Sequence, residues 1–465
     1  MRCEKRKEML QQLQKVIQLS MPAVMAQVSA VAMQYIDAAM VGSLGADATA
    51  AIGLVSSTTW LFGGLCIAAA TGFSVQAAQL IGGNRDGEAK QVLRQAVCAT
   101  FLFGMLLLAV GLSISQGLPV WLGGEASVCA EASRYFRIYA CALPAAQLRQ
   151  TAGSMLQCSG DMKVPGRLNM MMCALDVVFN SLLIFPSRQV VLFDHKVWIA
   201  GAGLGVAGAA LGTALSEVIT AACMLYAVLF RSVHLRLERG NQGLREFRPD
   251  AKRLRTALRL AVPMGMEHVI LCGAQIAGTR IVAPLGTVAV AANSLAVTAE
   301  SLCYMPGSGI SAAATTLVGQ NIGAGKPQLA KRYAGLSVAL GAMVMACTGG
   351  LMFLCAPFMF AMLTPDPAIR ALGARVLRIE AFAEPLFAVS IVAQGALRGA
   401  GDTLVPSLMN LASMWGVRIT ASVLLAPRFG LVGVWTAMCT ELCVRGVLFL
   451  IRLLRGKWLD RQIVV

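Results

Sequence analysis

Long apolar runs follow one another along almost the whole chain, and they restrict its fold more than any other feature. A run of about 20 apolar residues can cross a bilayer as an α-helix, which satisfies its own backbone polar groups. Twelve such runs are found, at residues 16–41, 47–79, 95–117, 132–157, 167–186, 203–230, 257–283, 288–320, 334–356, 370–398, 404–426 and 431–452. The sequence therefore predicts an all-α polytopic membrane protein with twelve transmembrane helices. The second, eighth and tenth runs are long and contain Gly or Pro, so we expect bends in them.

The composition supports a membrane protein rather than a soluble one. Of the 465 residues, 57% are hydrophobic and only 13% are charged, whereas soluble domains carry about 25% charged residues. The net charge of +16 does not indicate a nucleic-acid partner, because the Lys and Arg residues are confined to particular loops. The fourteen Cys residues are scattered singly, which favours free thiols over a metal site or disulfide framework. No metal and no cofactor are expected.

The distribution of basic residues predicts the orientation in the membrane. Lys and Arg are concentrated in the N-terminal segment, in the C-terminal tail and in the connection at residues 231–259, which has nine basic residues against three acids. The loops at 42–46 and 284–288 contain no charged residue. Since cytoplasmic loops carry the excess of Lys and Arg, both termini and the central connection are predicted to be cytoplasmic, with the chain in the plasma membrane.

The chain repeats itself at a constant shift of 241 residues. LGADATAAIGL at 44–54 matches LGTVAVAANSL at 285–295, and MLQCSGDMKVP at 155–165 matches ALRGAGDTLVP at 396–406. Each copy contains six predicted spans, an even number, so the two copies enter the membrane with the same polarity. This predicts a parallel repeat about a pseudo-twofold axis along the membrane normal.

The repeat divides the chain into an N-lobe, a linker and a C-lobe. The predicted bounds are residues 1–230 for the N-lobe, 231–256 for the basic cytoplasmic linker and 257–465 for the C-lobe. A transport site is expected at the cleft between two six-helix lobes, near the middle of the membrane. The first copy also carries an extra outer loop at residues 187–203 that the second copy lacks.

Polar residues lie inside the apolar runs of the N-lobe. Asp176 and Asn180 are one helical turn apart in the stretch ALDVVFNSLLIF, and Asp37 lies in the first span. A carboxylate at the centre of a span costs at least ~2.5–3.5 kcal/mol, so such residues are functional candidates by default. Their spacing from the span ends places Asp37 and Asn180 at similar depth, roughly 10 Å below the outer surface by the rise of a helix. We predict that the three residues surround one pocket, with Gln34 facing the same way and contributing to substrate binding.

The chemistry of such a pocket follows from burial. A low dielectric disfavours a charged carboxylate, and a second carboxylate nearby disfavours it further. Such a pair can therefore take up H⁺ or another cation from one side of the membrane and release it to the other. The alternative is a structural role, in which Asp176 only hydrogen-bonds to a neighbouring helix near Arg149 or Gln147.

The C-lobe has its own charged residues inside the spans. Glu267 and Arg280 lie in the seventh span, Glu300 in the eighth and Glu384 in the tenth. We predict that they contribute to substrate binding, because carboxylates attract organic cations. The alternative is an internal ion pair, for example between Glu300 and Arg280 or Arg418.

Two repeated turns are interpreted as structural. The segments 160–165 and 401–406 share the pattern Gly-Asp-x-x-Val-Pro, and their acids Asp161 and Asp402 are predicted to cap the N-termini of the helices that follow. The glycine-rich segments IGGN and IGAGK lack the Gly-Lys-Ser/Thr ending of a phosphate-binding loop, so they are expected to form turns.

Three segments carry a resemblance to a known family. PAVMAQVSAVAMQYIDAAMVGSLG in the first span, AATTLVGQNIGAGK at the end of the eighth and GALRGAGDTLVP between the tenth and eleventh resemble the multidrug and toxin extrusion (MATE) family, over nearly the whole chain. The likeness is nearer to the DinF-like branch than to NorM. It implies a 6+6-helix antiporter, not an enzyme, that exports organic and often cationic compounds in exchange for H⁺ or Na⁺.

The resemblance carries over only in part to the candidate residues. It implies a cation-coupling role for Asp37, which matches the acid of the first span. The fifth span often has Asn-x-x-x-Asp in the family, whereas this chain has Asp176 and Asn180 in the opposite order. In NorM-like members the acids of the seventh and tenth spans align with Leu271 and Phe387 of this chain, so its own C-lobe acids are displaced from the family positions.

Other interpretations stay open at this point. A major-facilitator fold also has twelve spans, but the connection IGGNRDGEAKQVLR does not match its usual motif. A flippase for lipid-linked oligosaccharides, from the same superfamily, and a membrane receptor without transport activity are the alternative functions. The favoured prediction is a cation-coupled exporter of organic, cationic small molecules, acting as a monomer in the lipid bilayer.

Overall fold

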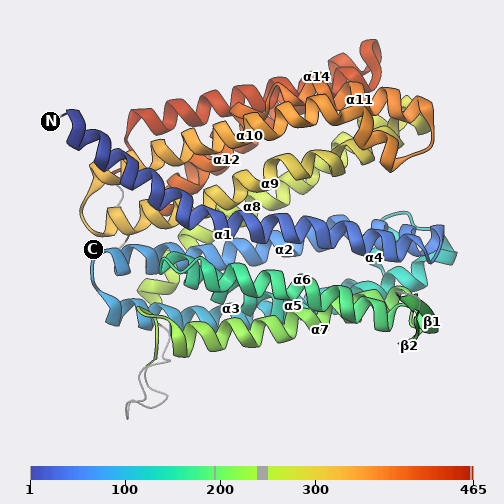
Figure 1. The fold of residues 1–465 in the computed structure, drawn as a ribbon, viewed down its shortest axis with the longest axis horizontal. Helices are drawn as coiled ribbons and strands as arrows, with labels where there is room; N and C mark the ends of the chain where they lie inside the picture. The colour runs from blue at the N-terminus through green and yellow to red at the C-terminus, as the bar shows by residue number, and fades with distance from the viewer. Residues whose placement is uncertain (1, 193–194, 238–249, 461–462, 464–465) are drawn as a thin grey trace. The chain divides into compact units, whose positions relative to one another are not determined.

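The computed structural model describes residues 2–192, 195–237, 250–460 and 463. Residues 238–249 of the predicted basic linker and the basic tail residue Arg461 lie outside this range. The described chain is helical except for one hairpin (Figure 1). Its elements are α1 (Arg2–Gly42), α2 (Ala46–Gly82), α3 (Asp86–Ile114), α4 (Leu118–Trp121), α5 (Ala126–Cys158), α6 (Lys163–Leu183), β1 (Pro186–Leu192), β2 (His195–Ala202), α7 (Val206–Tyr226), η1 (Ala227–Arg231), α8 (Ala251–Val282), η3 (Ala283–Leu285), α9 (Thr287–Gly323), α10 (Pro327–Leu363), α11 (Pro367–Ala381), α12 (Glu384–Gly399), α13 (Leu404–Ser413), η4 (Met414–Ile419) and α14 (Thr420–Arg455).

These elements form twelve membrane-spanning helices, as the apolar runs predicted. Seven of the described helices (α1, α2, α3, α7 with η1, α8 with η3, α9 and α10) are long and apolar enough to cross a membrane by length and composition alone. The other five spans are shorter, broken or more polar. Among them, α11 and α12 together form the tenth span, and α13, η4 and the start of α14 form the eleventh.

Breaks in the helices occur mainly in the second half of the chain. The tenth span is interrupted between α11 and α12, where a bend was expected. The helices α2 and α9, in which bends were also expected, are each assigned as one unbroken helix. The last two spans turn at Gly430, whose φ of 59° lies in the left-handed region. Only glycine adopts that conformation without a steric penalty, so α14 consists of two helices joined at this residue.

The first of two compact units comprises residues 29–74 and 86–258. In this unit α5 packs against both α3 and α7, and α6 packs against α7. Small residues allow the close approach, since a methyl group on Gly104 of α3 would lie 2.9 Å from the backbone of Pro144 in α5. Phe62, Phe136 and Leu143 form part of the apolar core beside this contact.

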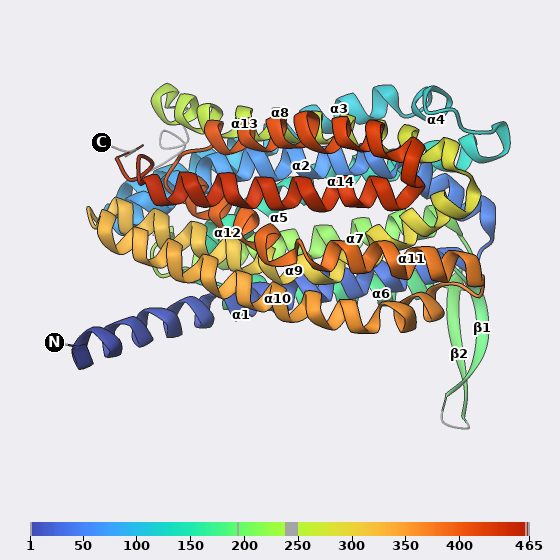
Figure 2. The same cartoon turned by 90° about the horizontal axis from the view of Figure 1, so that it is seen from above.

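An antiparallel hairpin lies between α6 and α7, where the sequence was interpreted as an outer loop. Strand β1 pairs with β2 from Pro186 opposite Ala202 to Leu192 opposite His195. Figure 2 shows the hairpin projecting from the ends of the helices that it joins. The strands were not predicted because the segments QVVL and KVWI are short. Their β-branched and aromatic residues nevertheless favour extended backbone.

The second compact unit comprises residues 1–28, 75–85 and 259–465. It contains the predicted C-lobe together with the first turns of α1 and the last turns of α2. Here α9 packs against α10 and α12, and α12 packs against α14. Phe360, Met352 and Trp435 belong to the apolar core of this unit. The indole Nε1 of Trp435 donates a hydrogen bond of 2.9 Å to Asn293 Oδ1.

The ends of α2 and α9 touch at equivalent positions of the repeat. A methyl group on Gly82 would lie 1.9 Å from the carbonyl oxygen of Gln320, and one on Gly323 would lie 1.8 Å from that of Gln79. Gly82 and Gly323 are 241 residues apart, as are Gln79 and Gln320. Each helix end therefore makes the same contact with the other, at positions that the repeat relates.

Of the two repeated turns, the first contains the predicted cap at Asp161, and in the second Asp402 forms an ion pair. Gly160 and Gly401 both adopt positive φ, at 91° and 86°. Asp161 Oδ1 accepts hydrogen bonds of 3.1 Å from the backbone N–H groups of Lys163 and Val164, which confirms its predicted cap. The fully buried Asp402 is held by Arg452, whose Nη2 lies 2.6 Å from Asp402 Oδ2.

Candidate cation site

Three of the predicted residues meet at one point between α1 and α6. Asn180 Nδ2 donates hydrogen bonds to Asp37 Oδ1 at 2.9 Å and to Asp176 Oδ2 at 3.0 Å. Asp176 and Asn180 are buried, and Asp37 is half-buried. One amide group therefore bridges two carboxylates that belong to different helices.

Helix α7 forms the third side of this cluster. Ser216 Oγ lies 3.3 Å from Asp176 Oδ1 and donates a hydrogen bond to it. A methyl group on Gly212 would lie 2.1 Å from Asn180 Oδ1, so only glycine allows α7 to approach so closely. The same Asn180 Oδ1 is buried and accepts no hydrogen bond from any described residue.

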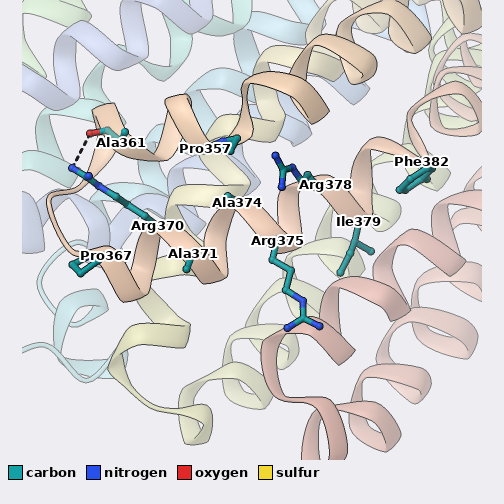
Figure 3. Close-up of a pocket in the computed structure, with 10 residues that line it drawn as sticks. All are labelled: Pro357, Ala361, Pro367, Arg370, Ala371, Ala374, Arg375, Arg378, Ile379 and Phe382. Atoms are coloured by element: carbon teal, nitrogen blue, oxygen red, sulfur yellow. Dashed lines mark hydrogen bonds between the residues drawn. The ribbon is translucent and has the colours of Figure 1, made fainter.

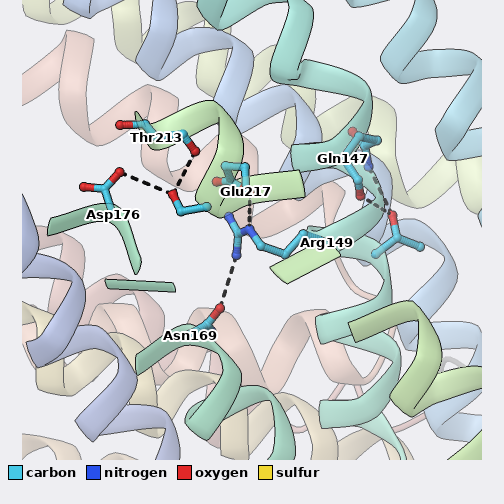
Figure 4. Close-up of polar contacts among 8 residues, drawn as sticks. Gln147, Arg149, Asn169, Asp176, Thr213 and Glu217 are labelled. Atoms are coloured by element: carbon cyan, nitrogen blue, oxygen red, sulfur yellow. Dashed lines mark hydrogen bonds and ion pairs between the residues drawn. The ribbon is translucent and has the colours of Figure 1, made fainter. Parts of the chain in front are cut away.

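The alternative partners predicted for Asp176 are engaged elsewhere. Arg149 forms an ion pair with Glu217 and donates a hydrogen bond of 3.3 Å to Asn169 (Figure 4). Gln147 donates to the carbonyl oxygen of Cys66 at 3.3 Å and to Thr151 Oγ1 at 3.2 Å. Asp176 thus does hydrogen-bond to a neighbouring helix, but that helix is α7 and not α5.

The cluster holds two acids without a basic partner. Within the described residues, neither Asp37 nor Asp176 forms an ion pair with a Lys or an Arg. Two unpaired carboxylates that share one amide in a low dielectric repel each other, and uptake of a proton or a metal cation relieves that repulsion. Gln34, which was predicted to face the same way, is exposed and forms no hydrogen bond with a described residue.

Glu267 lies at the centre of a separate network in the C-lobe. Its carboxylate accepts hydrogen bonds from Ser407 at 2.6 Å, Asn410 at 2.6 Å and Gln394 at 2.9 Å, and Arg398 Nη2 lies 3.7 Å away. The network ties α8 to α12 and α13. Since every acceptor oxygen of Glu267 is occupied, the network has the features of the internal ion pair that was the alternative to substrate binding.

The two remaining C-lobe acids belong to a cluster of glutamates. Glu300 and Glu384 are buried, and both lie within electrostatic reach of the buried Glu380. Of the described residues, none donates a hydrogen bond to either carboxylate oxygen of Glu380 or Glu384. Figure 1 shows their helices α9, α11 and α12 in the C-terminal half of the chain.

The ion pairs predicted for Glu300 are not formed. Arg280 is exposed and makes no ion pair with a described residue. Arg418 Nη2 lies 2.7 Å from Met438 Sδ. The nearby Arg445 instead pairs with Glu441, at 3.2 Å between Nε and Oε1, and Glu441 also accepts a hydrogen bond of 2.6 Å from Ser413.

Several of these residues escaped the sequence analysis. Glu380 lies one turn before Glu384, Glu217 lies inside the sixth span and Glu441 lies inside the twelfth, four residues before Arg445. Each is an acid inside an apolar run, which is the signal that drew attention to Asp37 and Asp176. A uniform search for that signal finds all three.

The comparison with protein families reproduces the repeat. The family model described as MatE matches residues 22–182 and again residues 263–424, well over half of the chain, with starting points 241 residues apart. The chain belongs to the MatE family.

Relatives with assigned names match this MatE protein over nearly its whole length. It is 25% identical over 451 residues to a "Probable multidrug resistance protein NorM" from Thermotoga maritima, with 97% of this chain and 94% of the relative covered. It is 28% identical over 466 residues to a protein of the same name from Chromobacterium violaceum, with 97% and 95% covered. These names do not support the expected placement nearer to the DinF-like branch.

Solved structures share its fold. A transporter of the MOP superfamily from Pyrococcus furiosus superposes with a TM-score of 0.87 at 18% identity, covering 97% of both chains. A multidrug resistance MATE transporter in an outward-facing conformation gives the same TM-score, identity and coverage. The MatE protein is therefore a multi-pass membrane transporter of the multidrug efflux family, and not an enzyme.

Proposed function

We propose that the protein is a cation-coupled antiporter that exports organic, cationic small molecules across the plasma membrane. Its membership of the MatE family and the name of its relatives, multidrug resistance protein, support the export of small molecules. The distribution of Lys and Arg supports cytoplasmic termini and a central cytoplasmic connection. The coupling ion, H⁺ or Na⁺, moves inward down its gradient while the substrate leaves.

The coupling site consists of Asp37, Asp176 and Asn180. A single observation carries this assignment: one amide hydrogen-bonds two carboxylates on different helices, and neither carboxylate has a basic partner among the described residues. When a cation binds between the two acids, it takes over the attraction that Asn180 Nδ2 supplies in its absence. The packing of α1 against α6 then depends on whether the site is occupied.

The geometry also supports a route from ion binding to helix movement. Asp37 is the only member of the cluster on α1, so breaking its 2.9 Å bond to Asn180 frees α1 from α6 at this depth. Pro22 lies inside α1 and removes one backbone hydrogen bond from it. A helix weakened at such a point bends more readily than an unbroken one.

The glutamate cluster of the C-lobe is proposed as a second acidic site. Glu300, Glu380 and Glu384 are nearly inaccessible to solvent, so their environment suits a proton or a small cation better than a bulky organic cation. The roles in substrate binding that were predicted for Gln34, Glu267, Glu300, Glu384 and Arg280 stay predictions, as does the monomeric state.

Efflux measurements in reconstituted vesicles test the coupling site. A fluorescent organic cation is loaded into vesicles, and a pH gradient or a Na⁺ gradient is imposed separately. The variants Asp37→Asn and Asp176→Asn should each lose at least about tenfold in gradient-driven efflux, because each removes one of the two charges that bind the ion. The matched control is Asp47→Asn, which removes an exposed acid at the start of α2.

The outcome of this experiment separates the possible ions. Efflux driven by the pH gradient alone identifies H⁺, and efflux driven by the Na⁺ gradient alone identifies Na⁺. If both variants transport as fast as the unmodified protein under either gradient, these residues do not couple transport to an ion.

A further inference from the structure

A groove rich in arginine opens on the surface between α10 and α11. It has a volume of about 780 Å³ and is lined by Pro357 and Ala361 of α10 and by one face of α11 from Pro367 to Phe382. Arg370, Arg375 and Arg378 are among the lining residues; in Figure 3 Arg370 and Arg378 extend toward α10, whereas Arg375 extends from the opposite side of α11. None of the ten residues that line the groove is acidic.

The surroundings of the groove are apolar and exposed. Leu354, Phe358 and Met362 of α10 have exposed fractions of 74%, 66% and 74%, and Phe382 at the end of α11 has 73%. Large side chains exposed in this way on a membrane-spanning helix form the surface that lipid tails contact. The arginines are therefore placed at a surface where a positive charge is costly unless it has a partner.

Two of the three arginines, Arg375 and Arg378, have N–H groups without a hydrogen-bond acceptor among the described residues. Arg370 donates hydrogen bonds to the carbonyl oxygens of Thr364 at 2.6 Å and Ala361 at 3.2 Å, and so it caps the C-terminal end of α10. Arg378 donates to the carbonyl oxygen of Phe353 through Nε, at 3.2 Å, and its guanidinium lies 5.4 Å from the centroid of the Phe353 ring, so its Nη groups have no hydrogen-bond acceptor among the described residues. Arg375 forms no hydrogen bond or ion pair with a described residue and is free to reorient.

The depth of these residues selects the kind of partner. Arg375 and Arg378 follow the first residue of α11 by eight and eleven positions, which is about 12 and 16 Å at the rise of a helix. By the proposed orientation, α11 starts at the outer surface, so both side chains reach the headgroup level by extending outward. Phosphates of lipids are the anions present at that level, and a guanidinium binds a phosphate through two parallel hydrogen bonds.

We propose that this groove is a binding site for one anionic phospholipid of the outer leaflet. The guanidinium groups of Arg375 and Arg378 hold its phosphate, and an acyl chain lies along Pro357, Ile379 and Phe382. The inference does not depend on the proposed ion coupling; its placement in the outer leaflet rests on the proposed orientation of the chain.

The repeat supplies a matched control. Arg134 and Arg137 of α5 correspond to Arg375 and Arg378 at the shift of 241 residues, and both are exposed. They stand at the same distance from the start of their helix. The N-lobe has Cys129 where the C-lobe has Arg370, Leu112 in place of Phe353 and Cys141 in place of Phe382. The N-lobe pair thus has the charge and depth of the groove without its other lining.

Native mass spectrometry of the purified full chain tests the proposal. Phosphatidylglycerol and phosphatidylcholine are titrated against the unmodified protein, Arg375→Gln/Arg378→Gln and Arg134→Gln/Arg137→Gln. We expect the groove variant to lose at least about tenfold in apparent affinity for phosphatidylglycerol, and the N-lobe variant to keep it. Arg375→Lys/Arg378→Lys should retain part of the affinity, because a lysine keeps the charge without the paired donors.

Three outcomes would overturn the proposal. One is equal retention of phosphatidylglycerol by the groove variant and the unmodified protein. Another is an equal loss in both double variants, which would mean that the arginines only extend to the membrane interface. The third is displacement of the lipid by glycerol phosphate, which would assign the site to a soluble anion. Thermal unfolding without lipid should give the same midpoint for all variants and so excludes misfolding.

Discussion

Gly82 of α2 and Gly323 of α9 are each pressed against the backbone of the other's helix, at positions related by the repeat. The atoms that a methyl group would meet are backbone atoms of Gln320 and Gln79. Backbone cannot move aside as the end of a flexible side chain can. The contact therefore requires glycine at both positions.

Replacing Gly82 with alanine should separate the ends of α2 and α9. The added methyl group would lie 1.9 Å from the carbonyl oxygen of Gln320, and overpacking of this kind costs about 1–3 kcal/mol. We expect a lower midpoint of thermal unfolding and greater labelling of a cysteine introduced nearby. The matched control is Gly87→Ala in α3, which has no atom within 4 Å of the added methyl group. A midpoint for Gly82→Ala equal to that of Gly87→Ala would contradict the contact.

Gly212→Ala should strengthen ion binding while leaving the fold intact. The methyl group would lie 2.1 Å from Asn180 Oδ1, and the amide is a side-chain group that can shift. Its displacement lengthens the hydrogen bonds to Asp37 and Asp176, each of which contributes about 1.5–3 kcal/mol as a bond to a charged group. Because these bonds hold the two carboxylates when no ion is bound, their weakening favours the ion-bound state, and we expect the ion concentration for half-maximal efflux to fall by about tenfold or more.

The control for this change is Gly63→Ala in α2, where nothing lies within 4 Å of the added methyl group. It should leave the half-maximal ion concentration unchanged. Equal values for the two variants would show that the amide position does not affect ion binding.

Glu267→Ala should be among the more destabilising single substitutions in the C-lobe. It leaves Arg398 without its acid and removes the acceptor from the donors of Ser407, Asn410 and Gln394. Breaking a buried ion pair by removing one partner costs about 3–5 kcal/mol. Thermal unfolding in detergent measures the effect, and Glu131→Ala at an exposed position of α5 should stay within about 0.5 kcal/mol. A midpoint close to that of the unmodified protein would mean that the network is not needed for stability.

Asp161 and Asp402 occupy equivalent positions of the repeat, but they should contribute differently to the free energy of unfolding. Asp161→Ala removes a cap that accepts two backbone hydrogen bonds, which costs about 0.5–2 kcal/mol. Asp402→Ala also leaves Arg452 unpaired beside a fully buried position, so it should cost about 3–5 kcal/mol. The two midpoints of unfolding, measured side by side, check the order. An equal loss would show that Arg452 contributes nothing beyond the cap.

Much of the candidate site could be predicted because its signals are local. A carboxylate inside an apolar run is visible without any knowledge of helix packing, so Asp37, Asp176 and Asn180 were found together. Glu217, Glu380 and Glu441 also lie inside apolar runs, but they were not predicted. The hairpin was missed because two short segments carry too few residues to establish a strand periodicity.

The sequence by itself determined the number of membrane-spanning helices, the two copies at a shift of 241 residues and the acids that lie inside the membrane. These are properties of segment length, hydropathy and spacing, which need no neighbour in space. Only the tertiary structure decided that Asp176 pairs with Ser216 and not with Arg149, and that Glu267 is enclosed by Arg398, Ser407 and Asn410. Partners forty or more residues apart in the chain meet only when helices take a particular rotation and depth, and these depend on packing between helices rather than on any one of them.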